Sequence, residues 1–224
     1  EEGLPIGYFY GYETDGLFQN QAEVDAHPSQ IALGSVAQAG DIRFKDVNGD
    51  GVLNSDDRKN IGNPIPDFVM GFNFSFKYKG LDLGVYTYAT IGNEIVRNYE
   101  RSQPNVNRLA YTLDRWTGEG TSNEVPRVTT AATANNIFSD FYVEDGSYFR
   151  IQKVQLGYVI PKRWTEKAFI REFRVFASVD NLYTFTNYTG FDPAASSGAP
   201  IGSGIDFGFY PASRIYTVGL NVKL

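Results

Sequence analysis

The 224-residue sequence predicts an all-β fold, as a segment of an antiparallel transmembrane β-barrel with long loops at one end and short turns at the other. Three observations support this class. Apolar and polar side chains alternate over long runs, as in strands that have one apolar and one polar face. These runs span about 9 to 13 residues, whereas soluble strands have about 5 to 6. The connections between the runs are alternately short and long, which is typical of outer-membrane barrels.

The clearest alternation lies in GFNFSFKYKG, residues 71–80, which places Phe72, Phe74 and Phe76 on one face of a strand. Gly80 predicts a tight turn, after which LDLGVYTYATIG returns as the second strand of a hairpin. The further predicted strands are SYFRIQKVQLGYVIP (147–161), REFRVFASVDNLYTFT (171–186), SRIYTVGLNVKL (213–224) and an opening strand around LPIGYFYGY (4–12). This makes about six strands.

The loops and strand ends fit the same class. Short connections occur at Gly80 and at 162–170, and long ones span 13–70, 93–146 and 187–212. Aromatic residues crowd the strand ends, as an interfacial girdle requires, namely Tyr78, Tyr86, Tyr88, Tyr148, Phe149, Trp164, Phe169, Tyr183 and Phe185. Six strands are too few to close a membrane barrel, since the smallest bacterial ones have about eight. Alternation alone also fits a soluble β-sandwich.

Composition excludes several function classes. The formal charge of −6 and the absence of a basic cluster argue against a nucleic-acid partner. The chain has no cysteine, and its one histidine, His27, lies in a polar turn without a nucleophile elbow elsewhere. Acidic residues that could form a glycosidase pair, such as Glu119, Glu124, Glu144 and Asp145, are ordinary in long polar loops. The sequence therefore predicts no enzyme, no catalytic residues and no organic cofactor.

The stretch DVNGDGVLNSDD, residues 46–57, has the spacing of a twelve-residue calcium loop. Its predicted metal ligands are Asp46, Asn48, Asp50, the Val52 carbonyl, Asn54 and Asp57, with Gly51 at the bend. Hard cations such as Ca²⁺ or Mg²⁺ prefer these oxygen ligands. An EF-hand needs flanking helices, and a dockerin has two such loops, but this chain has one loop and no helix beside it. Asx turns without an ion explain the same residues.

Several motifs, taken together and in order, resemble the carboxy-terminal part of the SusC/RagA family of TonB-dependent outer-membrane transporters. They are PIGYFYGYETDGLFQNQAEVDAH, GDIRFKDVNGDGVLNSDDR, IGNPIPDFVMGFNFSFKYKGLDLGVY, RWTGEGTSNEVPR, SYFRIQKVQLGYVIPK, FRVFASVDNLYTFTNYTGFDP and YPASRIYTVGLNVKL. The resemblance covers essentially the whole of residues 1–224. One departure is the last residue, Leu224, where such barrels usually end in an aromatic residue.

The resemblance implies a parent protein several times longer, with a signal peptide, a small amino-terminal domain, a plug domain and a 22-stranded barrel. It further implies import of oligosaccharides or peptides, energy supplied through the TonB complex, and a SusD-like surface lipoprotein as partner, in contact with outer-membrane lipid. Because the turn at Gly80 is short, it is expected to face the periplasm, which places the 46–57 loop in an extracellular connection. Ligand-contacting residues are not predicted. The alternative function is an extracellular calcium-stabilised binding or adhesion module, dockerin-like or a β-sandwich.

Overall fold

The computed structural model describes residues 3–100, 103, 106–194 and 201–224, and it divides the chain into two compact units. Unit 2 comprises residues 65–93, 145–195 and 209–224. Unit 1 comprises residues 1–64, 94–144 and 196–208, and therefore includes most of two long predicted connections. In the described part of the chain, no helix is both long enough and apolar enough to cross a bilayer.

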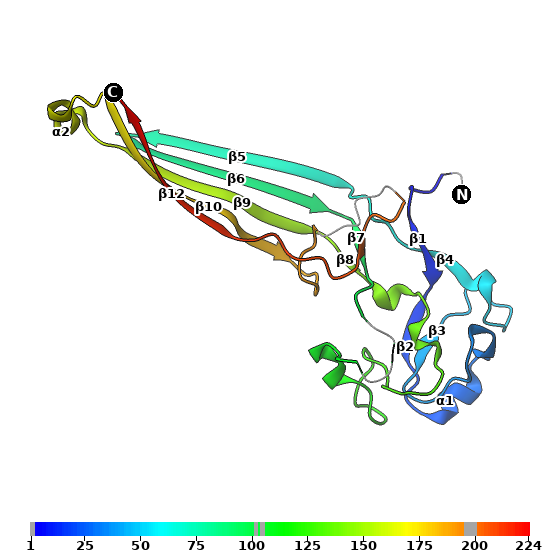
Figure 1. Cartoon of the computed structure of the whole chain (residues 1–224). Coiled ribbons are helices and arrows are strands. Elements are labelled where there is room, and N and C mark those ends of the chain that lie inside the picture. Colours follow the sequence, from blue (N-terminus) through cyan, green and yellow to red (C-terminus); the bar gives the residue numbers. More distant parts are fainter. Residues whose placement is uncertain (1–2, 101–102, 104–105, 195–200) are drawn as a thin grey trace. The chain divides into compact units, whose positions relative to one another are not determined.

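Unit 2 contains one antiparallel five-stranded sheet in the order β12-β10-β9-β6-β5 (Figure 1). The strands are β5 (Phe68–Tyr78), β6 (Leu81–Ile91), β9 (Tyr148–Val159), β10 (Glu172–Thr186) and β12 (Ile215–Lys223). Between β9 and β10 lie the short helix α2 (Lys162–Thr165) and the 3-10 turn η6 (Glu166–Ala168). All five strands were predicted from alternation, and four of them have 11 to 15 residues. The all-β barrel-segment prediction is thereby confirmed.

The β5–β6 hairpin has the tight turn that the sequence predicts, and the turn consists of two residues. Tyr78 pairs with Leu81, and the residues between them, Lys79 and Gly80, have φ angles of 46° and 88°. Two successive positive φ angles define a type I′ turn, whose twist matches that of the flanking strands. A side chain added to Gly80 would also meet the Val159 carbonyl oxygen at 2.8 Å. Glycine is required here for both reasons.

Strand β9 contains one extra residue, Gln152. Tyr86 of β6 pairs with Lys153 and Thr87 pairs with Ile151, which leaves Gln152 without a partner on β6. This is a β-bulge. The sequence carries its signal, because the apolar positions of this strand are odd-numbered before residue 152 and even-numbered after it. Strand β10 has an irregularity of its own between Asp180 and Tyr183.

Unit 1 consists of short strands, short helical turns and irregular chain. Its strands are β1 (Phe9–Tyr12), β2 (Thr14–Leu17), β3 (Ile42–Phe44), β4 (Arg58–Gly62), β7 (Glu94–Arg97), β8 (Val143–Asp145, which reaches into unit 2) and β11 (Ile205–Asp206). Its helical segments are α1 (Gln21–Ala26), η1 (Ile31–Leu33), η2 (Ser55–Asp57), η3 (Ala110–Asp114), η4 (Ala134–Asn136) and η5 (Asp140–Tyr142). These pieces form three small sheets, β1-β4, β2-β3 and β11-β7-β8.

The opening strand is the one strand prediction that needs correction. A strand forms at Phe9–Tyr12, but it pairs with β4 in unit 1 and does not join the five-stranded sheet. The main sheet of the described chain therefore has five strands where about six were predicted. Alternation in a four-residue strand indicates that it is extended, but it does not indicate its partner. Here the partner lies about 50 residues further along, at Arg58–Gly62.

Unit 1 is held together by a small apolar core and by buried polar contacts between distant residues. The core residues are Tyr12, Leu17, Ile42, Phe44, Leu53 and Ala134. Beside it, the buried Gln30 side chain donates to the Ile42 carbonyl and accepts from the Phe44 N–H, which ties β3 down on both sides of Arg43. The buried carboxylate of Asp41 accepts from Arg127 at 2.7 and 3.1 Å and from Asn135 at 3.0 Å.

Candidate functional site

The sheet of unit 2 has one apolar face to which all five strands contribute. One row across it consists of Phe74, Val85, Val154, Val179 and Tyr216, which are successive partners in the register. Side chains of directly paired residues lie on the same face of a sheet. Among the described residues the whole of β5 is exposed, and Phe74 and Tyr216, at the two ends of the row, are both exposed side chains. The face predicted from Phe72, Phe74 and Phe76 is thus present.

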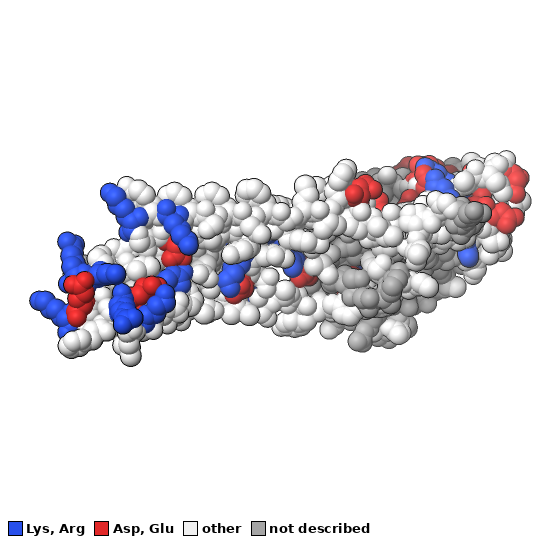
Figure 2. All heavy atoms as spheres, turned by 90° about the horizontal axis from the view of Figure 1, so that it is seen from above, with Lys and Arg blue, Asp and Glu red and all other residues white. Residues whose placement is uncertain are grey.

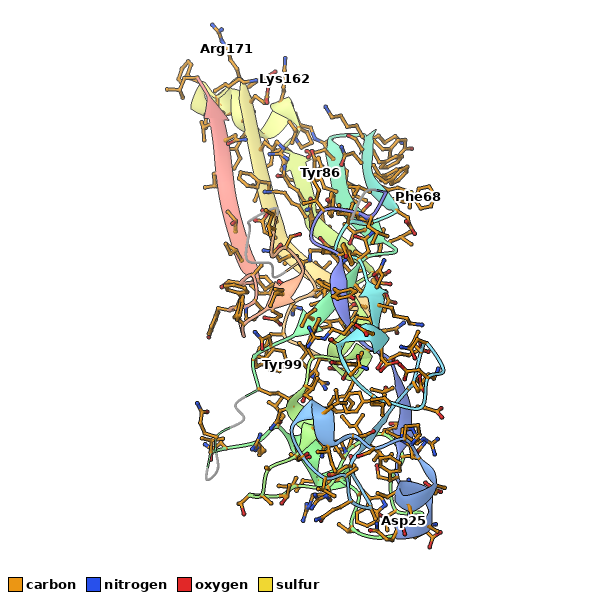
Figure 3. The ribbon with its side chains drawn as sticks, turned by 90° about the vertical axis from the view of Figure 1, so that its right-hand side faces the viewer. Asp25, Phe68, Tyr86, Tyr99, Lys162 and Arg171 are labelled. Atoms are coloured by element: carbon orange, nitrogen blue, oxygen red, sulfur yellow. The ribbon has the colours of Figure 1, made fainter. Side chains whose placement is uncertain are left out.

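Exposure of this face is large. Phe72 is 67% exposed and Val218 is 77% exposed, so both outer strands present their apolar side chains to the surroundings. Figure 3 labels Phe68, which begins the same face at one end of β5 and is 64% exposed. An uncovered apolar face of this extent is unfavourable in water and marks a contact with lipid or protein.

The opposite face of the same sheet is polar. The row next to the one described above consists of Ser75, Gly84, Gln155, Ser178 and Thr217. Ion pairs connect neighbouring strands on this face. Lys153 on β9 pairs with Asp180 on β10 at 3.1 Å, and Lys223 on β12 pairs with Glu172 on β10 at 2.8 Å. One apolar face and one polar face in long tilted strands is the arrangement of a barrel wall between lipid and a water-filled interior.

One ion pair on the polar face joins two strands that are not neighbours in the sheet. Arg174 on β10 donates to both carboxylate oxygens of Asp82 on β6, at 2.8 and 2.5 Å, although β9 lies between them. Gly157 is the β9 residue at the crossing, where a Cβ atom would collide with the guanidinium of Arg174 and with Asp82. The absence of a side chain at Gly157 therefore makes the bidentate pair possible. Charged residues at alternate positions of predicted strands signal such a pair, but the pairing of strands was needed to locate it.

The predicted aromatic girdle is only partly correct. Tyr78, Phe149, Tyr183 and Phe185 lie on the apolar face, and at one strand end the ring of Phe185 lies 6.0 Å from Phe149 and 4.7 Å from Tyr183. Tyr86, Tyr88 and Tyr148 instead lie on the polar face, where Tyr86 is paired with Lys153 (Tyr86 is labelled in Figure 3). Their strand positions have the parity of the polar face, which the prediction overlooked.

A buried ion pair attaches the long connection that follows β10 to the polar face. Arg150 on β9 pairs with Asp192, which also accepts from the N–H groups of Ala194 at 2.9 Å and Ala212 at 3.2 Å. Burial by itself would raise the pKa of Asp192, but the Ala194 N–H, the Arg150 guanidinium and the Ala212 N–H together hold that pKa below its usual value. Asp192 thus remains ionised and holds two separate parts of the connection.

Unit 1 contains a second polar cluster that the sequence did not reveal. Arg97 on β7 pairs with Glu100 at 2.9 Å and with Glu144 at 2.9 Å. Burial opposes the charge of Arg97, but these carboxylates raise its pKa overall. Tyr142 is half-buried near them, and the loss of solvent around its hydroxyl raises its pKa to about 12. Tyr111, which donates to Glu100, also has a raised pKa because of burial. Arg97 therefore stays protonated and the two tyrosines stay neutral at neutral pH, so the group acts as a structural cluster.

The 46–57 segment forms a compact loop that is closed by its own side chains. Asp46 accepts from the N–H groups of Gly49 and Gly51, each at 2.7 Å. Asn48 accepts from Asp50 N–H at 2.9 Å, and Asp50 accepts from Val52 N–H at 2.8 Å. Both glycines of the loop have positive φ angles, 75° and 80°. The loop is therefore a series of Asx turns.

The second half of the loop is anchored by Asp57, which is fully buried. Its two oxygens accept from Val47 N–H and Asn54 N–H, each at 2.9 Å, and Asn54 caps η2 by accepting from Asp56 N–H at 2.7 Å. The described residues include no group of three or more His, Cys, Asp or Glu that is placed to hold a metal ion. Carboxylate oxygens that accept one N–H still have a lone pair for a cation. The calcium loop stays a prediction.

Known proteins similar to this chain fall into one class. No family model matches the chain. "TonB-dependent receptor P3" of Formosa agariphila is 36% identical over 231 residues, which cover 99% of this chain and 22% of the relative. "TonB-dependent receptor SusC" of Bacteroides thetaiotaomicron is 25% identical over 216 residues, covering 95% of this chain and 20% of the relative. The chain thus spans less than a quarter of the length of these relatives.

Solved structures show the same fold. The RagAB peptide importer in the open-open state matches 99% of this chain with a TM-score of 0.71 and 22% identity, covering 23% of the matched chain. A second structure, of the RagAB peptide transporter, matches 96% of this chain with a TM-score of 0.71. The relatives, the matched fold and the two-faced sheet agree with the sequence motifs, and over nearly its whole length the chain is therefore similar to a segment of the outer-membrane β-barrel of SusC/RagA-type TonB-dependent receptors.

Proposed function

We propose that the chain forms part of the wall and surface loops of a TonB-dependent importer that takes oligosaccharides or peptides across the outer membrane. The observation that carries this proposal is the division of the sheet into an apolar face and a polar face, which all five strands share. An import channel needs such a wall, because lipid contacts one side and hydrated solute passes the other. The relatives that are named TonB-dependent receptors support the TonB complex as the source of energy for import.

The proposed partner is a SusD-like surface lipoprotein that docks on the loops. The similar structures of RagAB, a peptide importer and a peptide transporter, support a two-component assembly and favour peptides as one substrate class. Oligosaccharides are kept as the other class because the sequence motifs resemble the SusC/RagA family, for which they are the expected substrates. Within the chain, unit 1 supplies surface for docking, since it gathers long connections into a structure with its own buried core. No enzymatic role is proposed.

The alternative, an extracellular adhesion module stabilised by calcium, has less support. An adhesion module would cover an apolar face such as that of Phe72 and Val218 with a second sheet, and the described residues of unit 2 contain no such cover. The relatives also point to transport rather than to adhesion.

Uptake by the host bacterium tests the proposal. Cells with and without the gene of the full receptor are given fluorescently labelled oligosaccharide and peptide mixtures, with and without a protonophore. We expect intracellular label to require both the gene and the proton gradient, and the mixture that is taken up identifies the substrate class. Uptake that is equal in the two strains, together with a receptor found outside the outer membrane, would contradict the proposal. The co-purifying lipoprotein is identified by affinity capture through a tag on the receptor.

A further inference from the structure

Basic side chains gather at the end of unit 2 where the short turns lie. Figure 2 shows this group at the left, over the β5–β6 turn and the α2–η6 connector. Its exposed members include Lys79, Lys162, Arg163, Lys167 and Arg171. Among the described residues, none of these five side chains has a carboxylate partner at ion-pair distance, in contrast to Arg174 and Lys223 nearby, which do. The five cations are therefore available for an anion outside the chain.

Two large aromatic side chains accompany these cations on the same connector. Trp164 in α2 is 67% exposed, and Phe169 after η6 is 90% exposed. The guanidinium of Arg163 lies 5.6 Å from the Trp164 ring. The connector follows directly from β9, whose residues Leu156 and Tyr158 lie on the apolar face. Exposed aromatic rings beside basic groups, at the border of an apolar surface, are typical of segments that lie at a membrane interface.

The backbone at Phe169 gives a second, independent argument. Phe169 has a φ of 58°, in the left-handed region that a bulky side chain rarely adopts. Its N–H donates to the Glu166 carbonyl at 3.0 Å, and the Ile170 N–H donates to the Thr165 carbonyl at 3.3 Å. These two bonds form a Schellman motif, in which glycine is the usual residue at this position. A phenylalanine that is both strained and exposed contributes little to the fold, so its ring has a use outside the chain.

We propose that the connector at residues 162–171 is a membrane-interface anchor that binds the phosphate of anionic phospholipid headgroups. Trp164 and Phe169 enter the interface at the end of the apolar face, and the four connector cations surround the headgroups there. This proposal rests on the proposed function in one respect, because it requires the sheet to span a bilayer. Charge complementarity identifies the occupant: a purely apolar partner would leave the cations unused, and a soluble acidic protein would leave the two rings in water.

Lipid retained by the full receptor tests the anchor. The receptor is extracted from vesicles with equal amounts of phosphatidylglycerol and phosphatidylcholine, and the bound lipids are identified by native mass spectrometry. The test variant carries Lys162→Gln, Arg163→Gln, Lys167→Gln and Arg171→Gln, and the matched control carries Arg58→Gln, Lys59→Gln, Arg115→Gln and Arg214→Gln. We expect the enrichment of phosphatidylglycerol to fall at least about tenfold in the test variant, because one basic residue near an anionic surface changes partition about fivefold. The control should retain it.

The aromatic part of the anchor has its own test. Phe169→Gly removes the ring and suits the left-handed backbone, so thermal stability in detergent should stay equal or rise while lipid enrichment falls. A loss of stability in detergent would mean that the ring serves the fold, which would overturn this part of the proposal. In addition, a dye attached to the Phe169→Cys variant should be quenched by lipids brominated near the headgroup, whereas a dye attached to the Val47→Cys variant should not. Labelling of the receptor without added cysteine gives the background.

The outcomes separate the anchor from the proposed function. A folded, membrane-embedded receptor with equal lipid enrichment in wild type and test variant overturns the anchor alone. A wild-type receptor that does not insert into the bilayer overturns the proposed function and the anchor together. Protection of the connector from protease by inorganic phosphate in lipid-free detergent, at an ionic strength matched with chloride, would identify free phosphate as the ligand and overturn the headgroup assignment.

Discussion

Arg174 on β10 reaches across β9 to Asp82 on β6, with its Nε 2.8 Å from Oδ1 and its Nη2 2.5 Å from Oδ2. The pair fastens three strands of the polar face at a point where Gly157 leaves the path open. A charged pair that is held by two hydrogen bonds and is mostly shielded from solvent is sensitive to the loss of its geometry.

Gly157→Ala should separate Arg174 from Asp82, because the new Cβ occupies the space that their side chains share. We expect the stability of the folded receptor to fall by roughly 1 to 3 kcal/mol. Samples in SDS are heated to a series of temperatures before electrophoresis. The measurement is the temperature at which the band of the folded receptor disappears from the gel. Gly84→Ala is the matched control, since its Cβ would meet only Tyr86 at 3.5 Å, an ordinary contact. Equal midpoints for the two variants would contradict the argument.

Phe74→Arg and Ser75→Arg test which face contacts lipid. The two residues are neighbours on β5 and belong to opposite faces of the sheet. A charged side chain on the lipid side costs about 2 to 4 kcal/mol near the bilayer centre, whereas the interior tolerates it. The yield of folded receptor in outer-membrane fractions should therefore fall for Phe74→Arg and stay near wild type for Ser75→Arg. The reverse order would invert the assignment of faces.

Acidification should release the connection that Asp192 holds. The pKa of Asp192 is lower in the folded protein than its usual 3.8. Its stabilising contribution is therefore complete above about that usual pKa, and it is lost as the pH falls through the lower folded value. Hydrogen exchange at the Ala194 and Ala212 amides, corrected for the intrinsic pH dependence, should lose protection in this acidic range. In Asp192→Asn the protection should be weak at neutral pH already, and a pH-independent wild type would refute the linkage.

Removal of calcium tests whether the 46–57 loop holds an ion or is closed by its Asx turns alone. If Asp46, Asp50 and Asp57 share a Ca²⁺ ion, the cation relieves their mutual repulsion, and EGTA should loosen the loop without unfolding the barrel. Limited proteolysis of the full receptor with Ca²⁺ and with EGTA measures cleavage between Gly40 and Asn63. We expect faster cleavage in EGTA. Identical cleavage in both conditions would leave the hydrogen bonds of Asp46 and Asp57 as the complete explanation of the loop.

Asp46→Ala combined with Asp50→Ala adds a second comparison for the loop. The substitutions remove the bonds to Gly49, Gly51 and Val52 with or without an ion, so cleavage should increase in both conditions. Under the calcium interpretation the difference between Ca²⁺ and EGTA disappears in this variant, while membrane insertion stays normal and docking of the surface lipoprotein weakens. A difference that persists would exclude these two carboxylates as the ligands.

Asp41→Ala should destabilise unit 1 specifically. The substitution leaves the Arg127 guanidinium without its carboxylate and removes a bond to Asn135, and breaking a buried pair on one side costs about 3 to 5 kcal/mol. Proteolysis of the unit 1 segments should accelerate, while the SDS-gel midpoint of the barrel changes little. Asp25→Ala in α1 is the control, because it removes only an exposed bond from Gln21. A parallel fall of both readouts would mean that the two units unfold together.

The strands and their faces could be predicted because side chains of a strand alternate between its two faces, so the alternation of apolar and polar residues is visible in the sequence itself. The apolar face of β5 is indicated by Phe72, Phe74 and Phe76, and the turn is indicated by Gly80. The five strands, their order along the chain and the resemblance to SusC/RagA proteins followed from such local signals. The prediction that Phe9–Tyr12 joins the main sheet was wrong because the pairing partner of this strand is determined by packing in unit 1. No local sequence pattern identifies that partner.

The sites were less predictable than the strands. The sequence shows Arg174, Asp82 and Gly157 at suitable alternate positions, but only the register of three strands brings them together. The Asp41–Arg127 pair joins residues 86 positions apart through irregular chain, which leaves no periodic trace. The 46–57 loop was recognised because its spacing is local. Whether its oxygens serve an ion or only their own backbone is decided by affinity, which spacing does not encode.

The bulge at Gln152 makes one position of β9 dispensable in a way that its neighbours are not. Removing Gln152 would leave Ile151 and Lys153 adjacent, and every remaining side chain of the strand would keep its side of the wall next to β6. Removing Gln155 instead would shift the register by one residue, so that all side chains on one side of the deletion would move to the opposite face of the sheet. Length variation among homologous transporters should therefore be tolerated inside this membrane strand at residue 152, at a place where deletions are ordinarily the most damaging.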